Sequence, residues 1–198
     1  MTVKHYDWSA YNANVRPNKI AIRDLSTKKN LTYLELNNRA NKLAGWLQSK
    51  GVKKGDRVAI LSQNCPEFFE LEFACAKIGA IELPLNWRLT KPELEYILKD
   101  STPHVLIYDT MFLDITIDLQ KDCSIAASLQ IDSEDPNSQY EEALNNSDGS
   151  HEIVETTQED LIMIMYTSGT TGHPKGAMIN HQMQLYNAIN LASPAFVA

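Results

Sequence analysis

The sequence predicts an α/β fold with layered, mostly parallel sheets and flanking helices. Capped helices alternate with short, continuous apolar runs as far as Tyr108, and such runs are typical of strands that are buried on both faces of a parallel sheet. Helical crossovers between parallel strands bring the carboxyl ends of the strands to one edge, where we expect the functional loops. A chain of 198 residues is long enough for one sizeable core.

Two predicted helices begin with a capping box, in which a threonine hydroxyl and a glutamate carboxylate accept hydrogen bonds from free backbone N–H groups. Thr32 and Glu35 form the first box, and Thr90 and Glu93 form the second. Helical periodicity and glycine or proline boundaries complete the assignment. Helices are predicted over residues 8–15, 33–50, 66–78, 111–119 and 139–144, and from residue 91 onward. Strands are predicted over residues 21–23, 57–61, 80–85, 104–108, 124–131, 161–165 and 177–179.

Charge and cysteine content exclude several classes of function. The net charge of −7 and the isoelectric point near 5.2 argue against a nucleic-acid partner, which usually requires a basic face. Residues 132–160 are acidic, so we expect a surface excursion. We expect no metal site there, because the calcium-loop spacing is absent.

Three cysteines without metal-ligand spacing favour a reduced, cytoplasmic location. The sequence has no signal-peptide pattern and no apolar run of about 18 residues, so no transmembrane segment is expected.

Residues 165–178 read MYTSGTTGHPKGAM and directly follow the apolar run 161–165, which we expect to be a buried strand. Glycines permit positive φ angles and close approach of the backbone, successive N–H groups in such a turn bind anions, and hydroxyl and ammonium groups supply further donors. The stretch is therefore predicted to be a phosphate-binding loop between two strands, and a hairpin without a ligand is the alternative. The candidate binding residues are Thr167, Ser168, Gly169, Thr170, Thr171, Gly172, Lys175 and Gly176.

This loop differs from the Walker A pattern, G-x-x-x-x-G-K-[ST]. His173 and Pro174 separate Gly172 from the lysine, and a glycine follows the lysine. A nucleoside triphosphatase of that class is therefore a poor fit. We expect His173 to face solvent. His181 follows Asn180, a favourable N-cap residue, so His181 is either a first-turn helix residue or a ligand contact.

Residues 167–176, TSGTTGHPKG, resemble the signature loop of the adenylate-forming enzymes, the superfamily of AMP-dependent synthetases and ligases. This superfamily includes acyl- and aryl-CoA synthetases, firefly-type luciferases and the adenylation domains of peptide synthetases. Similarity extends upstream over residues 31–36, 55–60, 76–80 and 84–86. Within the superfamily, residues 84–89 and 93–98 look like the branch of fatty-acyl-CoA synthetases, the long-chain fatty acid–CoA ligases.

The resemblance implies an ATP-dependent ligase that joins a carboxylic acid, here a fatty acid, to AMP and then transfers the acyl group to coenzyme A. It implies ATP, Mg²⁺ and coenzyme A as cofactors or co-substrates. It also implies that the loop hydroxyls bind the β- and γ-phosphates, that the glycines allow close approach, and that Lys175 is catalytic by stabilising pyrophosphate charge. The alternatives are an aryl-CoA ligase, a peptide-synthetase adenylation domain, and a non-catalytic ATP-binding or interaction module.

Motifs that the superfamily uses for adenine, ribose, magnesium and a C-terminal lysine are not found in the sequence. We therefore expect residues 1–198 to be an incomplete N-terminal domain that is inactive alone, with a strand, the phosphate loop and a second strand over residues 161–180. An apolar helix with Leu185, Ile189 and Leu191 lies near the last residue. We expect exposed core surface there to cause self-association.

Overall fold

The computed structural model describes residues 7–167 and 173–192. The strands of this part are β1 (Ile20–Arg23), β2 (Asn30–Thr32), β3 (Arg57–Leu61), β4 (Ile81–Pro84), β5 (Val105–Asp109), β6 (Ala127–Ile131), β7 (Leu161–Thr167) and β8 (Lys175–Asn180). The helices are α1 (Trp8–Val15), α2 (Tyr33–Ser49), α3 (Pro66–Ile78), α4 (Lys91–Ser101), the 3₁₀ helix η1 (Thr110–Phe112), α5 (Leu113–Asp122), α6 (Gln139–Asn145) and α7 (His181–Ala192). The short strand β2, which pairs with β1, was not predicted.

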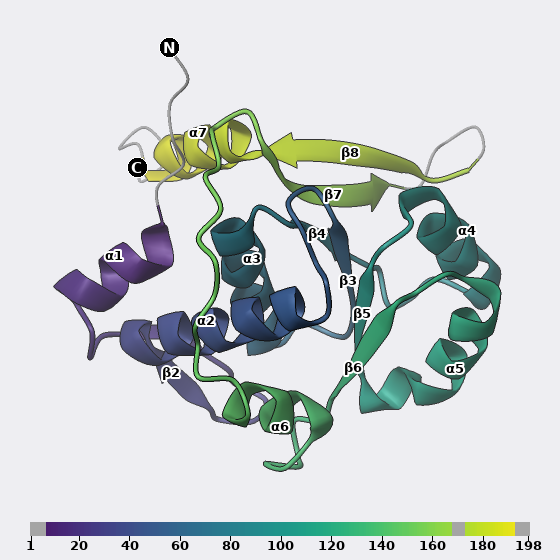
Figure 1. Cartoon of the computed structure of the whole chain (residues 1–198), viewed down its shortest axis with the longest axis horizontal. Helices are drawn as coiled ribbons and strands as arrows, with labels where there is room; N and C mark the ends of the chain where they lie inside the picture. Colours follow the sequence, from purple (N-terminus) through teal and green to yellow (C-terminus); the bar gives the residue numbers. More distant parts are fainter. Residues whose placement is uncertain (1–6, 168–172, 193–198) are drawn as a thin grey trace.

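One sheet of six strands organises the fold, in the order β6-β5-β3-β4-β7-β8. Neighbouring strands are parallel from β6 to β7, and β8 returns antiparallel to β7. Helices cover both faces of the sheet, with α2 and α3 on one side and α4 and α5 on the other (Figure 1). The predicted fold class, a mostly parallel α/β arrangement with flanking helices, is confirmed.

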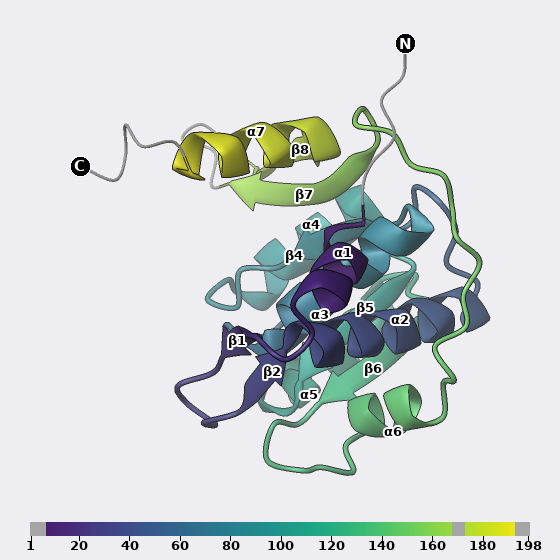
Figure 2. The same ribbon diagram turned by 90° about the vertical axis from the view of Figure 1, so that its left-hand side faces the viewer.

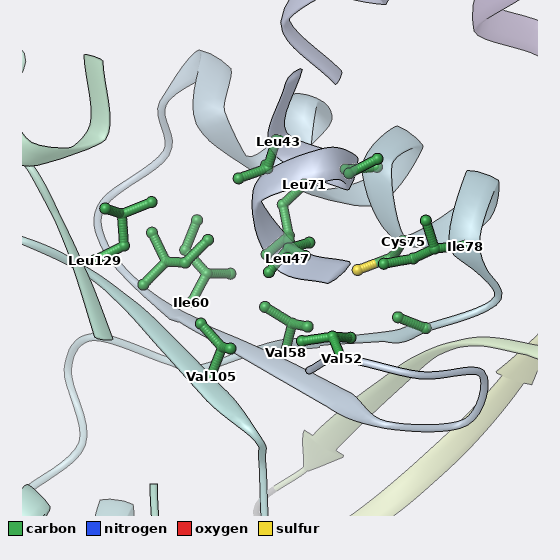
Figure 3. Packing of buried hydrophobic residues seen from close by; sticks show 14 of the residues in the cluster. Leu43, Leu47, Val52, Val58, Ile60, Leu71, Cys75, Ile78, Val105 and Leu129 are labelled. Carbon is green, nitrogen blue, oxygen red and sulfur yellow. The ribbon is translucent and has the colours of Figure 1, made fainter. Parts of the chain in front are cut away.

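Two apolar cores lie on the opposite faces of this sheet. Alternate residues of β3 enter each core: Val58 and Ile60 pack with α2 and α3 (Figure 3), whereas Ala59 and Leu61 pack with α4 and α5. All four side chains are fully buried. A strand that is covered on both faces has no polar side, which explains its continuous apolar run in the sequence.

The predicted helix boundaries depend on local chemistry that the structure shows directly. The Glu35 carboxylate accepts a hydrogen bond of 2.8 Å from the Thr32 backbone N–H, and the box at residues 90–93 has the same geometry. Gly79 ends α3 with φ of +69°, in the left-handed region where a side chain is unfavourable. These contacts involve residues at most four positions apart, so the local sequence is enough to predict them.

Residues 132–160 were expected to form a surface excursion, but α6 within them belongs to the core. Tyr140 and Leu144 are each 1% exposed and pack with α2 and α3. The Tyr140 hydroxyl donates a hydrogen bond of 2.8 Å to the buried carboxylate of Glu70, which Arg39 also contacts at 2.7 Å. After α6 the chain runs back past α2 to β7 (Figure 2). The prediction was wrong here because the burial of a short helix depends on partners far away in the sequence.

The three cysteines are free thiols in the structure. Cys75 and Cys123 are buried, one in each core, and burial raises the pKa of both thiols. They therefore pack as small apolar side chains. Within residues 7–167 and 173–192, no helix combines the length and the apolar character that crossing a bilayer requires.

Candidate phosphate-binding hairpin

The predicted phosphate loop connects β7 to β8, which pair as an antiparallel hairpin at one side of the sheet (Figure 1). Thr167 ends β7, Lys175 begins β8, and these two residues are partners in the register of the hairpin. Both residues are exposed to solvent. The other predicted loop residues lie outside the described residues: Ser168, Gly169, Thr170, Thr171 and Gly172. A hydroxyl and an ammonium group therefore stand at the two ends of the loop, at the carboxyl end of a parallel strand.

The strand before the loop was expected to be buried, which is wrong for most of its length. Ile162 is 1% exposed, but Met165 is 46% exposed, and Met178 on β8 is 64% exposed. The hairpin lies at one end of the strand order, and the helices that cover both faces of β3 and β5 cover less of the hairpin. An apolar run identifies a strand, but it does not show how much of that strand is covered.

Packing inside the hairpin explains one glycine of the predicted site. Gly176 pairs with Tyr166 across the two strands. A Cβ atom at position 176 would lie 2.9 Å from Ile164 Cγ2 and 3.2 Å from the Tyr166 ring. Such overpacking forces side chains or backbone to shift. Packing against Ile164 and Tyr166 thus requires a glycine at position 176. A role of Gly176 in phosphate binding stays a prediction.

Two contacts hold the hairpin against α4. The Tyr166 hydroxyl donates a hydrogen bond to the Asp100 carboxylate, and burial together with this carboxylate raises the pKa of Tyr166. His173 is exposed, as predicted, and also stacks on the Tyr96 ring, with the ring centroids 4.5 Å apart and the planes at 14°. Sequence reasoning missed Tyr96 and Asp100, because they lie far from the loop along the chain. Helix α4 thus contacts β7 through Tyr166 and the segment just before β8 through His173.

After β8, His181 lies in the first turn of α7, which is one of the two alternatives predicted for it. Asn180 caps this helix, since its side-chain oxygen accepts a hydrogen bond of 2.9 Å from the Met183 N–H. His181 is the first helical residue and is 3% exposed, and its backbone N–H donates to the Asp160 carbonyl at 3.1 Å. The cap and the helix start follow directly from the local sequence.

Two carboxylates lie next to the hairpin, one buried (Glu82) and one half-buried (Glu72). Glu82 on β4 pairs with Met163 of β7 and is 1% exposed, and its Oε2 has no hydrogen-bond partner in the described part of the chain. Burial raises the pKa of Glu82 well above its ordinary value, and the nearby charge of Glu72 raises it further. Burial also raises the pKa of Glu72, which accepts a hydrogen bond from Gln184 of α7. The protonated forms are therefore favoured on this side of the hairpin.

Proteins of known activity resemble this chain over most of its length. It is 35% identical to the feruloyl-CoA synthase of Amycolatopsis sp over 184 residues, which cover 93% of this chain and 35% of the relative. It is 38% identical to the long-chain-fatty-acid–CoA ligase FadD13 of Mycobacterium tuberculosis over 172 residues, which cover 86% of this chain and 33% of the relative. The solved anthranilate CoA ligase AuaEII, in complex with anthranoyl-AMP, matches with a TM-score of 0.82 and 26% identity over 92% of this chain and 35% of that structure.

The chain spans about a third of the length of the curated relatives it matches. The family described as AMP-binding enzyme matches residues 9–197, which include both arms of the hairpin. The resemblance to adenylate-forming enzymes that the loop indicated is thereby confirmed. This chain belongs to the AMP-binding enzyme family.

Proposed function

We propose that residues 1–198 are the N-terminal part of an ATP-dependent acyl-CoA synthetase, with a strand, the phosphate loop and a second strand over residues 161–180. The observation that carries this proposal is the hairpin, which presents Thr167 and Lys175 as register partners at the base of a loop rich in glycine and threonine. Family membership supports the same function. Because the chain spans about a third of the length of its relatives, we expect it to be inactive alone.

In this proposal the loop binds the polyphosphate of ATP. The hydroxyls assigned to the β- and γ-phosphates are those of Thr167, Ser168, Thr170 and Thr171, and the glycines that allow close approach are Gly169, Gly172 and Gly176. The substrate carboxylate attacks the α-phosphate, and the bond from that phosphate to pyrophosphate breaks while Lys175 stabilises the charge on the departing pyrophosphate. Such a transfer depends on positioning and charge stabilisation, so no side chain of the chain has to act as a nucleophile.

Mg²⁺ accompanies ATP in this proposal, and coenzyme A accepts the acyl group with release of AMP. The described residues contain no cluster of three or more side chains that could hold a metal ion. We therefore assign Mg²⁺ to phosphate oxygens and to groups outside the described residues. A cytoplasmic location is also proposed, and the three free cysteines support it.

For the carboxylate substrate we propose a fatty acid, in agreement with the 38% identity to a ligase of long-chain fatty acids. An aryl acid is the second candidate, and the 35% identity to feruloyl-CoA synthase favours it. ATP–pyrophosphate exchange by the full-length protein, measured with a panel of fatty acids and aryl acids, distinguishes the two. Failure of exchange with every carboxylate would remove the proposed enzymatic function.

Replacing Lys175 with alanine should lower the exchange rate about 10- to 100-fold, because a hydrogen bond to a charged group is worth about 1.5–3 kcal/mol. The matched control is Lys99→Ala, which removes an exposed ammonium group that pairs with Glu95 on α4. This control should retain the exchange rate, and both variants should melt near the wild-type temperature. An unchanged rate in Lys175→Ala would reject the role assigned to this side chain.

A further inference from the structure

Helix α4 contacts the chain on both sides of the predicted phosphate loop, beside the ends of β7 and β8 (Figure 1). Before the loop, the Tyr166 hydroxyl donates a hydrogen bond to the Asp100 carboxylate. After the loop, His173 stacks on the Tyr96 ring, with the ring centroids 4.5 Å apart and the planes at 14°. Tyr96 and Asp100 are four positions apart in α4, so they lie on one face of this helix. A single helix face thus contacts both arms of the hairpin.

The core holds α4 in place. Leu94, Ile97 and Leu98 on this helix are each 1% exposed and belong to the core between the sheet and α4. Tyr96 of α4 and Tyr166 of β7 are partly buried and pack against the same core. Close-packed side chains of this kind resist displacement. Helix α4 is therefore a fixed support for the hairpin.

The stack of His173 on Tyr96 lies only two residues before Lys175 in the chain. Pro174 connects His173 to Lys175, and a proline fixes its own φ near −65° and restricts the preceding residue to extended conformations. Few backbone rotations therefore separate the stacked ring from the lysine. The lysine side chain is long and flexible, so the position of its ammonium group depends on the backbone from which it starts.

Tyr166 is held from two directions, directly before Thr167. Its ring packs against Gly176 on β8, where an added Cβ atom would lie 3.2 Å from the ring. Its hydroxyl donates to Asp100, and hydrogen bonds to a charged acceptor are stronger than those between neutral groups. Thr167 itself is exposed. The contacts of Tyr166 therefore fix the backbone that presents the Thr167 hydroxyl.

We propose that Tyr96 and Asp100 are positioning residues for the phosphate-binding groups of the hairpin. Tyr96 fixes the start of β8, and with it the place of the Lys175 ammonium group. Asp100 fixes the end of β7, and with it the place of the Thr167 hydroxyl. The inference rests on the function proposed above, in which these two groups bind the polyphosphate of ATP. A displacement of about 1 Å can lower a rate about 100-fold, so a support that does not touch the ligand can affect the rate.

ATP–pyrophosphate exchange by the full-length protein at saturating ATP tests this role. Tyr96→Leu keeps an apolar side chain against the core but removes the stack, and it should lower the rate about 3- to 10-fold, as expected for the loss of one aromatic pair. Tyr96→Phe keeps the ring and should retain the wild-type rate. The matched control is Tyr33→Leu, which removes another partly buried tyrosine ring, at the start of α2. This control should also retain the rate.

A double-variant comparison separates positioning from general packing. His173 is exposed, so His173→Ala should fold and should lower the exchange rate as Tyr96→Leu does, which keeps the role testable if Tyr96→Leu is unstable. Tyr96→Leu should have no further effect in the His173→Ala background, because the stack is already absent. Asp100→Ala and Tyr166→Phe should likewise each lower the rate about 3- to 10-fold and should not add to one another.

Isothermal titration calorimetry with pyrophosphate distinguishes this inference from the proposed enzymatic function. The full-length wild type should bind pyrophosphate saturably, and Tyr96→Leu should bind it about 3- to 10-fold more weakly. This difference in affinity, without exchange for any carboxylate, would remove the enzyme but support the positioning role. The positioning role is overturned if the wild type does not bind pyrophosphate, if Tyr96→Leu matches the wild type in both assays, if Tyr96→Phe loses the rate, or if Tyr96→Leu lowers the rate equally in the His173→Ala background.

Discussion

The interior strands of the sheet and the β7–β8 hairpin differ in how they are covered. Every residue of β3 after Arg57 is buried, and helices pack on both faces of the strand. Along the described hairpin, Ile162 is buried, whereas Met165 and Met178 are 46% and 64% exposed. Interior strands therefore supply stability, while the hairpin leaves its groups accessible to a ligand. Rigid strands that present an accessible loop are a common basis for binding sites.

Truncating an interior side chain should show the largest contrast. Ile60→Ala on β3 should lower the free energy of unfolding by about 2–5 kcal/mol, because it leaves a cavity in a fully packed core. Met178→Ala on β8 removes a side chain that is mostly exposed and should cost less than about 0.5 kcal/mol. Urea denaturation of both variants provides the measurement. If Ile60→Ala and Met178→Ala lowered the free energy of unfolding by similar amounts, the interior strands and the hairpin would not differ in stability as proposed.

The buried carboxylate at the boundary between the two regions should respond to pH. The pKa of Glu82 is raised in the folded state, so the stability of its protonated form is fully present below the ordinary value of 4.5 and is lost as the pH rises toward the folded-state pKa. Glu82→Gln cannot ionise. It should match the wild type near pH 4 and exceed it by about 1–3 kcal/mol at neutral pH, the scale of an unsatisfied buried polar group.

Melting temperatures of the wild type and Glu82→Gln, measured from pH 4 to pH 8, give this difference directly. A difference that stays constant over the whole range would show that the ionisation of Glu82 is not coupled to folding.

Within the hairpin, a destabilisation smaller than that of Ile60→Ala is expected for Gly176→Ala. The added Cβ would lie 2.9 Å from Ile164 Cγ2, and overpacking of this kind costs about 1–3 kcal/mol. We expect about 1 kcal/mol, because an exposed strand can shift more easily than an interior one. Thermal unfolding of Gly176→Ala, Ile164→Ala and the double variant tests the contact. Purely additive losses would indicate that the two positions do not interact.

Local chemistry determined how much of the fold was predictable. The capping box at Thr32 and Glu35 and the left-handed Gly79 involve neighbours in the sequence, and both were predicted correctly. Tyr140 was not recognised as a core residue, because its partner Glu70 lies 70 positions away. No pattern within a seven-residue helix can report such a partner.

The candidate site shows the same limit. The composition of the loop indicated both the ligand and the family, and the family was confirmed. The supports of the hairpin, Tyr96 and Asp100 on α4, could not be inferred, because the sheet order and not the sequence brings them to the loop. Exposure of β7 was also missed, since it depends on which helices reach the side of the sheet.

The pairing of β4 with β7 has a consequence for the chain during its synthesis. Glu82 and its partner Met163 are about 80 residues apart, and ribosomes add about 5–20 residues per second. That side of β4 therefore waits on the order of 4–16 s for its neighbour, as an open strand that another nascent chain could join. A charged side chain in the middle of such a strand discourages this pairing. The carboxylate that weakens the finished sheet thus protects the growing one.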